Sequence, residues 1–130
     1  MTTKFIIDTD VTIDMLRGEP QAIAIFKELS ETLGFSAITV AEIYAGIANK
    51  KEESMVEQMF ASFPVIATTV EIARIAGRFS QRFRSSHALE MPDAIIAASC
   101  ITYDASLLTL NTKHYPMFPG LKPPYKKSNP

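Results

Sequence analysis

Short runs of consecutive apolar residues recur along this chain, and each is followed by a segment in which apolar residues have helical spacing. The first run, Phe5 to Ile7, ends at the acid Asp8, and similar runs lie at 35–38, 65–67 and 107–110. Strands with consecutive apolar residues are typical of a parallel sheet that is covered on both faces. We therefore expect an α/β fold with three α/β/α layers and a small, mainly parallel sheet of four to five strands.

Apolar residues at intervals of three and four predict the helices between these runs. The expected helices lie near 9–18, 20–33 with Gly34 as the end, 39–49, 51–63, a long one opening at 68–71, and 92–101. The inward residues of the helix at 51–63 are expected to be Met55, Val56, Met59, Phe60 and Phe63. Thr39 with Glu42, and Thr68 with Glu71, have the spacing of a capping box and predict two helix starts.

The chain has 130 residues, of which 47% are hydrophobic, enough for one substantial core. We expect one domain at 1–122 and a flexible, proline-rich tail at 123–130. No apolar stretch approaches the ~18 residues of a membrane span, and no signal sequence is recognisable, which predicts a soluble, cytoplasmic protein. The single cysteine, Cys100, lies in an apolar run and is expected to be buried.

Charge is distributed unevenly although the net charge is only -1. The first half of the chain is acidic and the second half is basic, with Arg74, Arg78 and Arg82 four residues apart on the long helix. A polyanionic partner is compatible with this pattern, but a general DNA-coating protein is not. For the arginines, a solvated helix face is the better expectation.

Three acids, Asp8, Glu42 and Asp93, stand beside hydrophobic segments. A carboxylate at the edge of a core is costly to desolvate unless it is paired, hydrogen-bonded or bound to a cation. If the fold brings the three together, their mutual repulsion favours a divalent metal. Each also has a structural explanation: Asp8 as an N-cap, Glu42 in its capping box, and Asp93 as a first-turn acid.

The motifs around these acids resemble the PIN domain family, and more narrowly its VapC-type toxins. The matching segments are Phe-Ile-Ile-Asp8-Thr9-Asp10, then Thr39-Val-Ala-Glu42-Ile-Tyr-Ala-Gly, then Pro-Asp93-Ala-Ile-Ile-Ala-Ala, then Leu-Thr109-Leu-Asn111-Thr-Lys-His114-Tyr. The resemblance covers about residues 4 to 122. It implies a Rossmann-like PIN fold and a metal-dependent endoribonuclease toxin. It also implies inhibition by a cognate VapB-type antitoxin, a homodimer and no membrane association.

The resemblance carries the family's acidic cluster over to Asp8, Glu42 and Asp93. Two positions depart from the family pattern: Asp10 replaces the usual asparagine, and the neutral Asn111 stands where many PIN domains have a fourth acid. Asn111 or Asp10 is a candidate for that fourth position or for support of the metal ligands. His114 is expected to be a surface loop histidine.

Hard oxygen ligands suit Mg²⁺, with Mn²⁺ as the alternative, and the few histidines and the single cysteine give no structural zinc cluster. Such ions lower the pKa of a bound water and neutralise charge on a phosphate during in-line attack. We expect Asp8 and Asp93 to hold the metal and Glu42 to orient water or a second ion. Arg17 and Lys113 are candidate contacts to RNA.

Two other functions remain open from the sequence. The segment from Asp8 to Thr12 also matches the first motif of haloacid dehalogenase-like phosphatases, in which Asp8 is a nucleophile and Asp10 an acid/base. The neutral Asn111 keeps open a catalytically weak PIN-like module that only binds a partner. Loss of RNA cleavage on Asp8→Asn or Asp93→Asn separates the nuclease from both alternatives.

Overall fold

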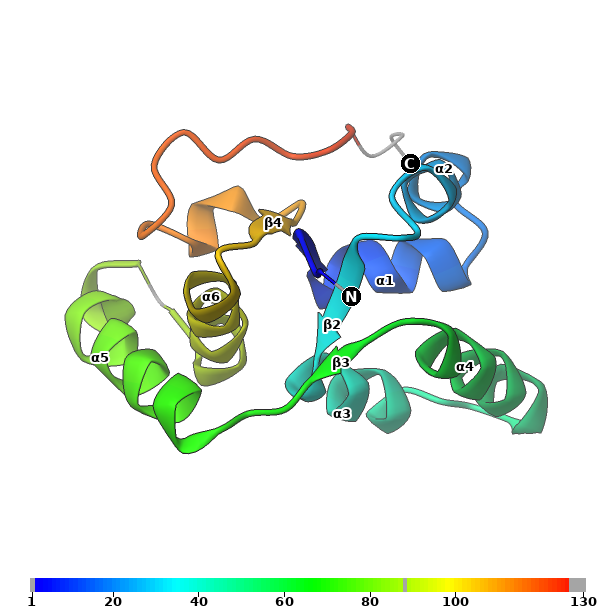
Figure 1. Ribbon diagram of the computed structural model, residues 1–130, viewed down its shortest axis with the longest axis horizontal. Helices are drawn as coiled ribbons and strands as arrows, with labels where there is room; N and C mark the ends of the chain where they lie inside the picture. The colour runs from blue at the N-terminus through cyan, green and yellow to red at the C-terminus, as the bar shows by residue number, and fades with distance from the viewer. Residues whose placement is uncertain (1, 88, 127–130) are drawn as a thin grey trace.

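A four-stranded sheet forms the centre of the computed structural model, which describes residues 2–87 and 89–126 (Figure 1). All of the strand pairs are parallel, and their order is β3-β2-β1-β4. The strands are β1 (Phe5–Ile7), β2 (Leu33–Ser36), β3 (Val65–Ile66) and β4 (Ser106–Leu108). The predicted α/β fold class, with its small parallel sheet, is confirmed.

Six α-helices surround the sheet in the described part of the chain, and a short 3₁₀ helix follows β4 (Figure 1). The helices are α1 (Thr9–Leu16), α2 (Pro20–Glu28), α3 (Ala37–Ala45), α4 (Lys50–Ser62), α5 (Val70–His87), α6 (Met91–Tyr103) and η1 (Thr112–His114). α5 and α6 cover one face of the sheet, whereas α1, α2 and α4 lie on the other. This arrangement is the expected three-layer architecture.

The strand order creates a switch point between β1 and β4. The chain winds outward from β1 through β2 to β3, and it then returns to the other side of β1 to form β4. Ile7 pairs with Leu108, so Asp8 and Thr109 leave neighbouring strands at the same edge. The crevice outside the carboxyl ends of strands at such a point is the usual ligand site of an open α/β sheet.

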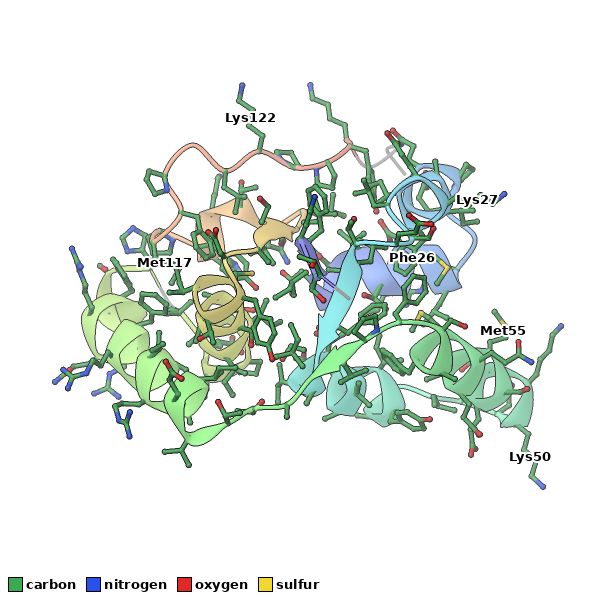
Figure 2. All side chains as sticks on the ribbon, in the orientation of Figure 1. Phe26, Lys27, Lys50, Met55, Met117 and Lys122 are labelled. Carbon is green, nitrogen blue, oxygen red and sulfur yellow. The ribbon has the colours of Figure 1, made fainter. Side chains whose placement is uncertain are left out.

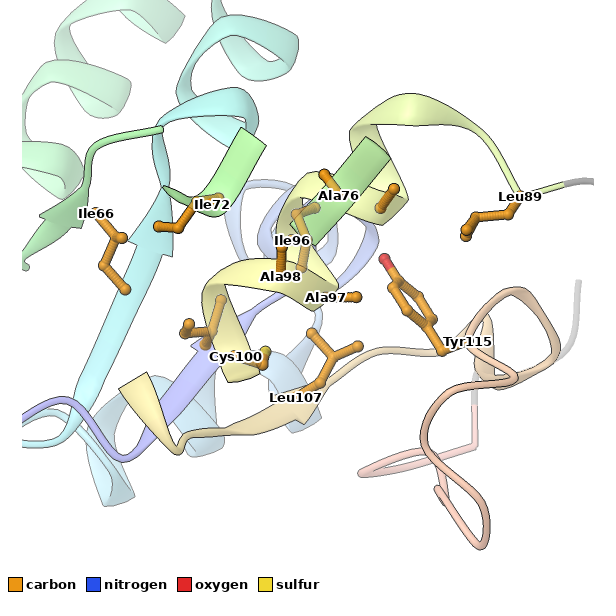
Figure 3. Close-up of a cluster of buried hydrophobic side chains, with 12 residues drawn as sticks. Ile66, Ile72, Ala76, Leu89, Ile96, Ala97, Ala98, Cys100, Leu107 and Tyr115 are labelled. Carbon is orange, nitrogen blue, oxygen red and sulfur yellow. The ribbon is translucent and has the colours of Figure 1, made fainter. Parts of the chain in front are cut away.

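Both faces of β1 are buried, which explains its consecutive apolar residues. Ile6 belongs to the core beneath α5 and α6, where Ile96, Ala97 and Leu107 also lie (Figure 3). Ile7 belongs to the core on the opposite face. There the fully buried Phe35 ring contacts three other aromatic rings, those of Phe26, Phe60 and Phe63.

Gly34 does not end a helix as predicted, because α2 already ends at Glu28 and Gly34 lies inside β2. The position is buried, and an added Cβ would lie 2.8 Å from Thr3 Cγ2. Close approach of the N-terminal segment therefore explains the glycine. The helical spacing of apolar residues continues to Leu33, because an apolar residue at this position fits both a helix and a buried strand.

Both predicted capping boxes are wrong in detail. α3 begins after Ser36, whose side chain accepts the N–H of Ile38 at 3.2 Å, and Thr39 lies within the helix. α5 begins after Thr69, which accepts the N–H of Ile72 at 3.2 Å, so Thr68 is not the capping residue. The capping-box spacing therefore predicted the approximate start of each helix but not the capping residue.

The predicted inward face of α4 holds except at Met55. Val56 and Met59 are buried, and Phe60 and Phe63 pack against the core. Met55 is 43% exposed, and Figure 2 shows it on the side of α4 that faces α1. Helical spacing predicted an inward Met55 because the apolar stripe of α4 is wider than the part of the helix that packs on the core.

The segment after η1 runs over the domain from the side of α6 and β4 to α2 (Figure 1). Tyr125 is buried and donates its hydroxyl to Asp14 at 2.7 Å, and Gln21 Nε2 donates to the backbone oxygen of Lys126. The described part of the predicted tail therefore packs on the domain, while residues 127–130 lie outside the described residues. The domain division at 122 stays a prediction.

Two further expectations concern Cys100 and the membrane. Cys100 is buried and free of any disulfide, and burial raises the pKa of its thiol to about 12, so it is inert at neutral pH. Across residues 2–87 and 89–126, we find no helix with the length and apolar character that a membrane crossing requires.

Candidate active site

Asp8 stands at the carboxyl end of β1, where it is only 4% exposed. Its Oδ1 caps α1 by accepting the N–H of Thr9 at 2.7 Å. Its Oδ2 accepts two hydroxyl groups, from Thr109 at 2.7 Å and from Tyr115 at 2.9 Å. Asp8 therefore combines the two roles that the sequence suggested, since it caps a helix and also presents a carboxylate at the switch point.

Asp93 lies in the first turn of α6, where its partners come from the segment around η1. Its Oδ1 accepts the Tyr115 hydroxyl at 3.3 Å, and its Oδ2 lies 3.4 Å from Nδ1 of His114. One phenol thus links Asp93 to Asp8. His114 is half exposed, as expected of a surface histidine, and its ring also pairs with a site acid.

Asp10 is turned toward the backbone. Its Oδ1 accepts the N–H of Val11 at 2.7 Å, and its Oδ2 accepts the N–H of Leu110 at 2.9 Å. The Thr109 hydroxyl, 3.5 Å from the same Oδ2, lies between Asp10 and Asp8. Asp10 therefore ties the start of α1 to the loop after β4, and both of its oxygens already have donors.

Glu42 reaches the site through Thr9. The Thr9 hydroxyl donates to Glu42 Oε1 at 2.7 Å and lies 3.1 Å from the Thr39 hydroxyl. Thr39 is fully buried inside α3, so the capping box that offered a structural explanation for Glu42 does not form. The Glu42 side chain instead projects to the solvent-exposed rim beside Asp8, which is linked to it through Thr9.

The remaining predicted residues occupy the border of the site. The backbone N–H of Asn111 donates to Thr109 Oγ1 at 3.0 Å, and its side chain is exposed. Lys113 is exposed on η1, next to His114. Arg17 is exposed at the end of α1, where it lines a groove with Glu42.

The buried acids repel one another. The pKa of Asp10 is raised to about 6, first by burial and then by the negative charge of Asp8. Burial and then Asp8 also raise the pKa of Asp93, although the nearby His114 lowers it. Among the residues that the structure describes, the His114 ring is the one basic side chain in ion-pair contact with Asp8, Asp10, Glu42 or Asp93. The cluster therefore carries negative charge that a cation would balance.

The donor set is suited to a hard divalent cation, since it consists of carboxylate oxygens with hydroxyl support. In residues 2–87 and 89–126, no three or more His, Cys, Asp or Glu side chains are already arranged to hold a metal ion. Asp8 and Asp93 meet through Tyr115, while the Glu42 carboxylate is turned to Thr9.

A groove of about 220 Å³ adjoins Glu42 and runs between α1, α3 and α4. Its lining is mostly apolar, with Ile13, Leu16, Ile43, Gly46, Ile47, Met55 and Val56, and its polar members are Arg17, Glu42 and Glu52. Gly46, four residues after Glu42, keeps this part of the lining small. The exposed Met55 side chain is thus part of the groove rather than of the core.

Hydroxyl groups were the part of the site that the sequence did not assign. In the described part of the chain, Thr109 joins Asp8 to Asp10 and Tyr115 joins Asp8 to Asp93. Thr9 joins Glu42 to Asp8 through its hydroxyl and its N–H, and Thr39 lies beside the Thr9 hydroxyl. Thr109 had a signal, because it follows the last apolar strand directly and the parallel register places it opposite Asp8. Tyr115 had no such signal in the sequence, because its position depends on the path of the chain around η1.

The fold and the site together define a doubly wound α/β protein with an acidic crevice at its switch point. A model of the PIN domain matches residues 5–117. Ribonuclease VapC19 of Mycobacterium tuberculosis is 42% identical over 124 residues, which cover 92% of this chain and 98% of that protein. Ribonuclease VapC10 of the same organism is 37% identical and covers 92% of each chain.

Solved structures of toxin-antitoxin complexes contain chains with the same fold. One chain of a toxin-antitoxin complex from Klebsiella pneumoniae superposes with a TM-score of 0.82 at 27% identity, covering 95% of this chain and all of that one. A chain of the DNA-bound VapBC complex from Salmonella typhimurium gives a TM-score of 0.80 at 21% identity, with 93% and 96% coverage, and supports the fold. The protein described here belongs to the PIN domain family, within the group of VapC ribonucleases.

Proposed function

We propose that this protein is the toxin of a toxin-antitoxin pair and acts as a metal-dependent endoribonuclease. The observation that carries the proposal is the gathering of Asp8, Asp10 and Asp93 at the switch point, with Glu42 on its exposed rim. The relatives named ribonucleases at 42% and 37% identity support the same activity.

In this proposal, Asp8 and Asp93 hold Mg²⁺, or Mn²⁺ in its place, through their carboxylate oxygens. The ion would supply charge neutralisation at the phosphate and a lowered pKa for water. Glu42, at the open rim, orients the attacking water and accepts its proton. The water oxygen bonds to phosphorus while one P–O ester bond breaks, the leaving oxygen takes up a proton from solvent, and Glu42 returns its proton to solvent.

Asp10 supports the metal ligands instead of binding the ion, because backbone N–H groups of Val11 and Leu110 occupy its two oxygens. This arrangement also argues against the phosphatase alternative, which requires Asp10 to exchange protons with a substrate. Asn111 keeps its amide exposed next to the same loop, where it can hydrogen-bond a water of the ion's coordination shell.

RNA is proposed to lie across the rim, in contact with Lys113 and Arg17. Lys113 lines a surface hollow together with the partly exposed Pro116 and Phe118, so a cation stands beside apolar and aromatic surface. Single-stranded nucleic acids bind to such combinations through phosphate contacts and base stacking. Arg17 lies on the other side, in the groove beside Glu42.

The test is cleavage of an end-labelled RNA with single-stranded loops by purified, antitoxin-free protein. We expect internal cuts with Mg²⁺ or Mn²⁺ and none in EDTA, with activity restored when the ion is added back. RNA that stays intact under every ionic condition would support the partner-binding module. Hydrolysis of small phosphomonoesters without RNA cleavage would support the phosphatase.

We further propose that a VapB-type antitoxin occupies the groove between α1, α3 and α4. The groove offers apolar surface next to Glu42, so a segment lying in it would also cover the site. Structural neighbours found in toxin-antitoxin complexes support such a partner. The homodimer remains a proposal as well, supported by the half-exposed apolar side chains of Ile101 and Tyr103 on α6.

Expression in a bacterial host tests the partner. The protein alone should stop growth, and co-expression of the small open reading frame adjacent to its gene should restore it. Met55→Glu places a charge in the apolar groove and should weaken that relief, whereas Lys50→Glu, at an exposed position outside the groove lining, should not. Equal relief of both variants would place the antitoxin elsewhere.

A further inference from the structure

We propose that Tyr115 is a positioning residue that holds Asp8 and Asp93 together in the arrangement that receives the metal ion. The inference rests on the proposed function, because it concerns the same site. Tyr115 follows η1, in a loop, yet it is 1% exposed and belongs to the core beneath α6. Figure 3 shows its ring among the apolar side chains of that core.

The phenol oxygen is shared by the two carboxylates. It lies 2.9 Å from Asp8 Oδ2 and 3.3 Å from Asp93 Oδ1. A phenol has one hydrogen, so it donates to one carboxylate at a time and exchanges it with the other. Both acids are drawn toward one neutral donor, which offsets their repulsion and limits the distance between them.

Asp93 depends on this donor more than Asp8 does. Asp8 Oδ2 has a second hydroxyl, that of Thr109, and Asp8 Oδ1 has the N–H of Thr9. Asp93 has the phenol and, at 3.4 Å, the half-exposed His114 ring. The phenol is therefore the buried partner that fixes the direction of the Asp93 side chain.

The position of the hydroxyl is fixed by packing. The Tyr115 N–H donates to the oxygen of Thr112 at 3.2 Å, and its ring stacks on Phe118 with centroids 6.4 Å apart. A rigid donor between two ligands lowers the reorganisation that metal binding requires.

Tyr115→Phe removes the hydroxyl and keeps the ring, and Tyr125→Phe is the matched control. Tyr125 is also buried and also donates to a buried aspartate, Asp14, at 2.7 Å. Binding of Mn²⁺ alone is measured by electron paramagnetic resonance of the free ion. We expect about tenfold or greater weakening in Tyr115→Phe, and no change in Tyr125→Phe.

Kinetics with RNA add a second measurement. Tyr115→Phe should lower kcat at limiting Mn²⁺ and regain it at high Mn²⁺, with KM for RNA unchanged. Equal Mn²⁺ binding by wild type and Tyr115→Phe would overturn the role of Tyr115 alone. Absence of Mn²⁺ binding by the wild-type protein would overturn the proposed metal site as well.

If Tyr115→Phe does not fold, the wild-type hydroxyl can be observed directly. The chain has four tyrosines and no tryptophan. A triple variant with Tyr44→Phe, Tyr103→Phe and Tyr125→Phe therefore keeps Tyr115 as its single tyrosine. Addition of Mg²⁺ should then shift the tyrosine absorption band, because the ion changes the acceptors of the phenol. An unchanged band at saturating Mg²⁺ would overturn the proposal.

Discussion

Asp8→Asn and Asp93→Asn should each reduce RNA cleavage by about 10³-fold or more, since each removes one negative ligand of a charge-stabilising metal. Asp8 lies deepest in the cluster and is surrounded by three donors, so its amide replacement also places an NH₂ group against hydroxyls. Asp93 is the less buried ligand. We expect the larger loss of activity at Asp8.

Single-turnover cleavage of a labelled RNA measures this loss, with KM compared to separate binding from chemistry. Asp14→Asn is the control, because Asp14 is buried on α1 and hydrogen-bonded to Tyr125 on the opposite side of the sheet from α6. Thermal unfolding confirms that each variant is folded. Near-normal cleavage by both site variants would refute the proposed assignment of metal ligands.

The stability of the metal-free protein should fall as the pH rises toward neutrality because of Asp10. Its pKa is raised by burial from 3.8 to about 6 in the folded protein. Between these values the folded state binds the proton and the unfolded state releases it. The stabilising contribution of the protonated form is therefore complete below pH 3.8 and is lost as the pH passes through about 6.

Asp10→Asn removes this titration, so the unfolding free energy of the variant relative to wild type should increase between pH 4.5 and 7. After allowance for solvent screening, the expected increase is about 1–3 kcal/mol. At low pH the variant should be the less stable protein, since one amide oxygen cannot serve both the Val11 and Leu110 N–H groups. Urea unfolding in EDTA at several pH values measures the difference.

Asp104→Asn is the matched control for that series. Asp104 is exposed at the end of α6 and has a left-handed backbone conformation that asparagine also tolerates. Its pH series is the reference for the Asp10→Asn series. An Asp10→Asn difference that changes with pH no more than this reference would show that the charge of Asp10 is not destabilising.

The sequence predicted the fold well where burial alone decides the pattern. β1 reads as a consecutive apolar run because Ile6 and Ile7 face two different cores. The exact caps were harder to predict, since Ser36 and Thr39 are both good capping residues and the choice between them depends on where β2 ends. The prediction that Gly34 ends a helix was wrong. The residue that requires a glycine there, Thr3, is far away in sequence.

By itself, the sequence determined the α/β class, the acidic residues and the edge of the sheet where Asp8 would stand, because these follow from local periodicity and from the cost of burying charge. The tertiary structure alone decided how the acids are connected. Tyr115, Thr109 and Thr9 join residues up to 107 positions apart, and such contacts have no local signature. Hydrogen bonds of this kind depend on chain path, which the burial pattern does not encode.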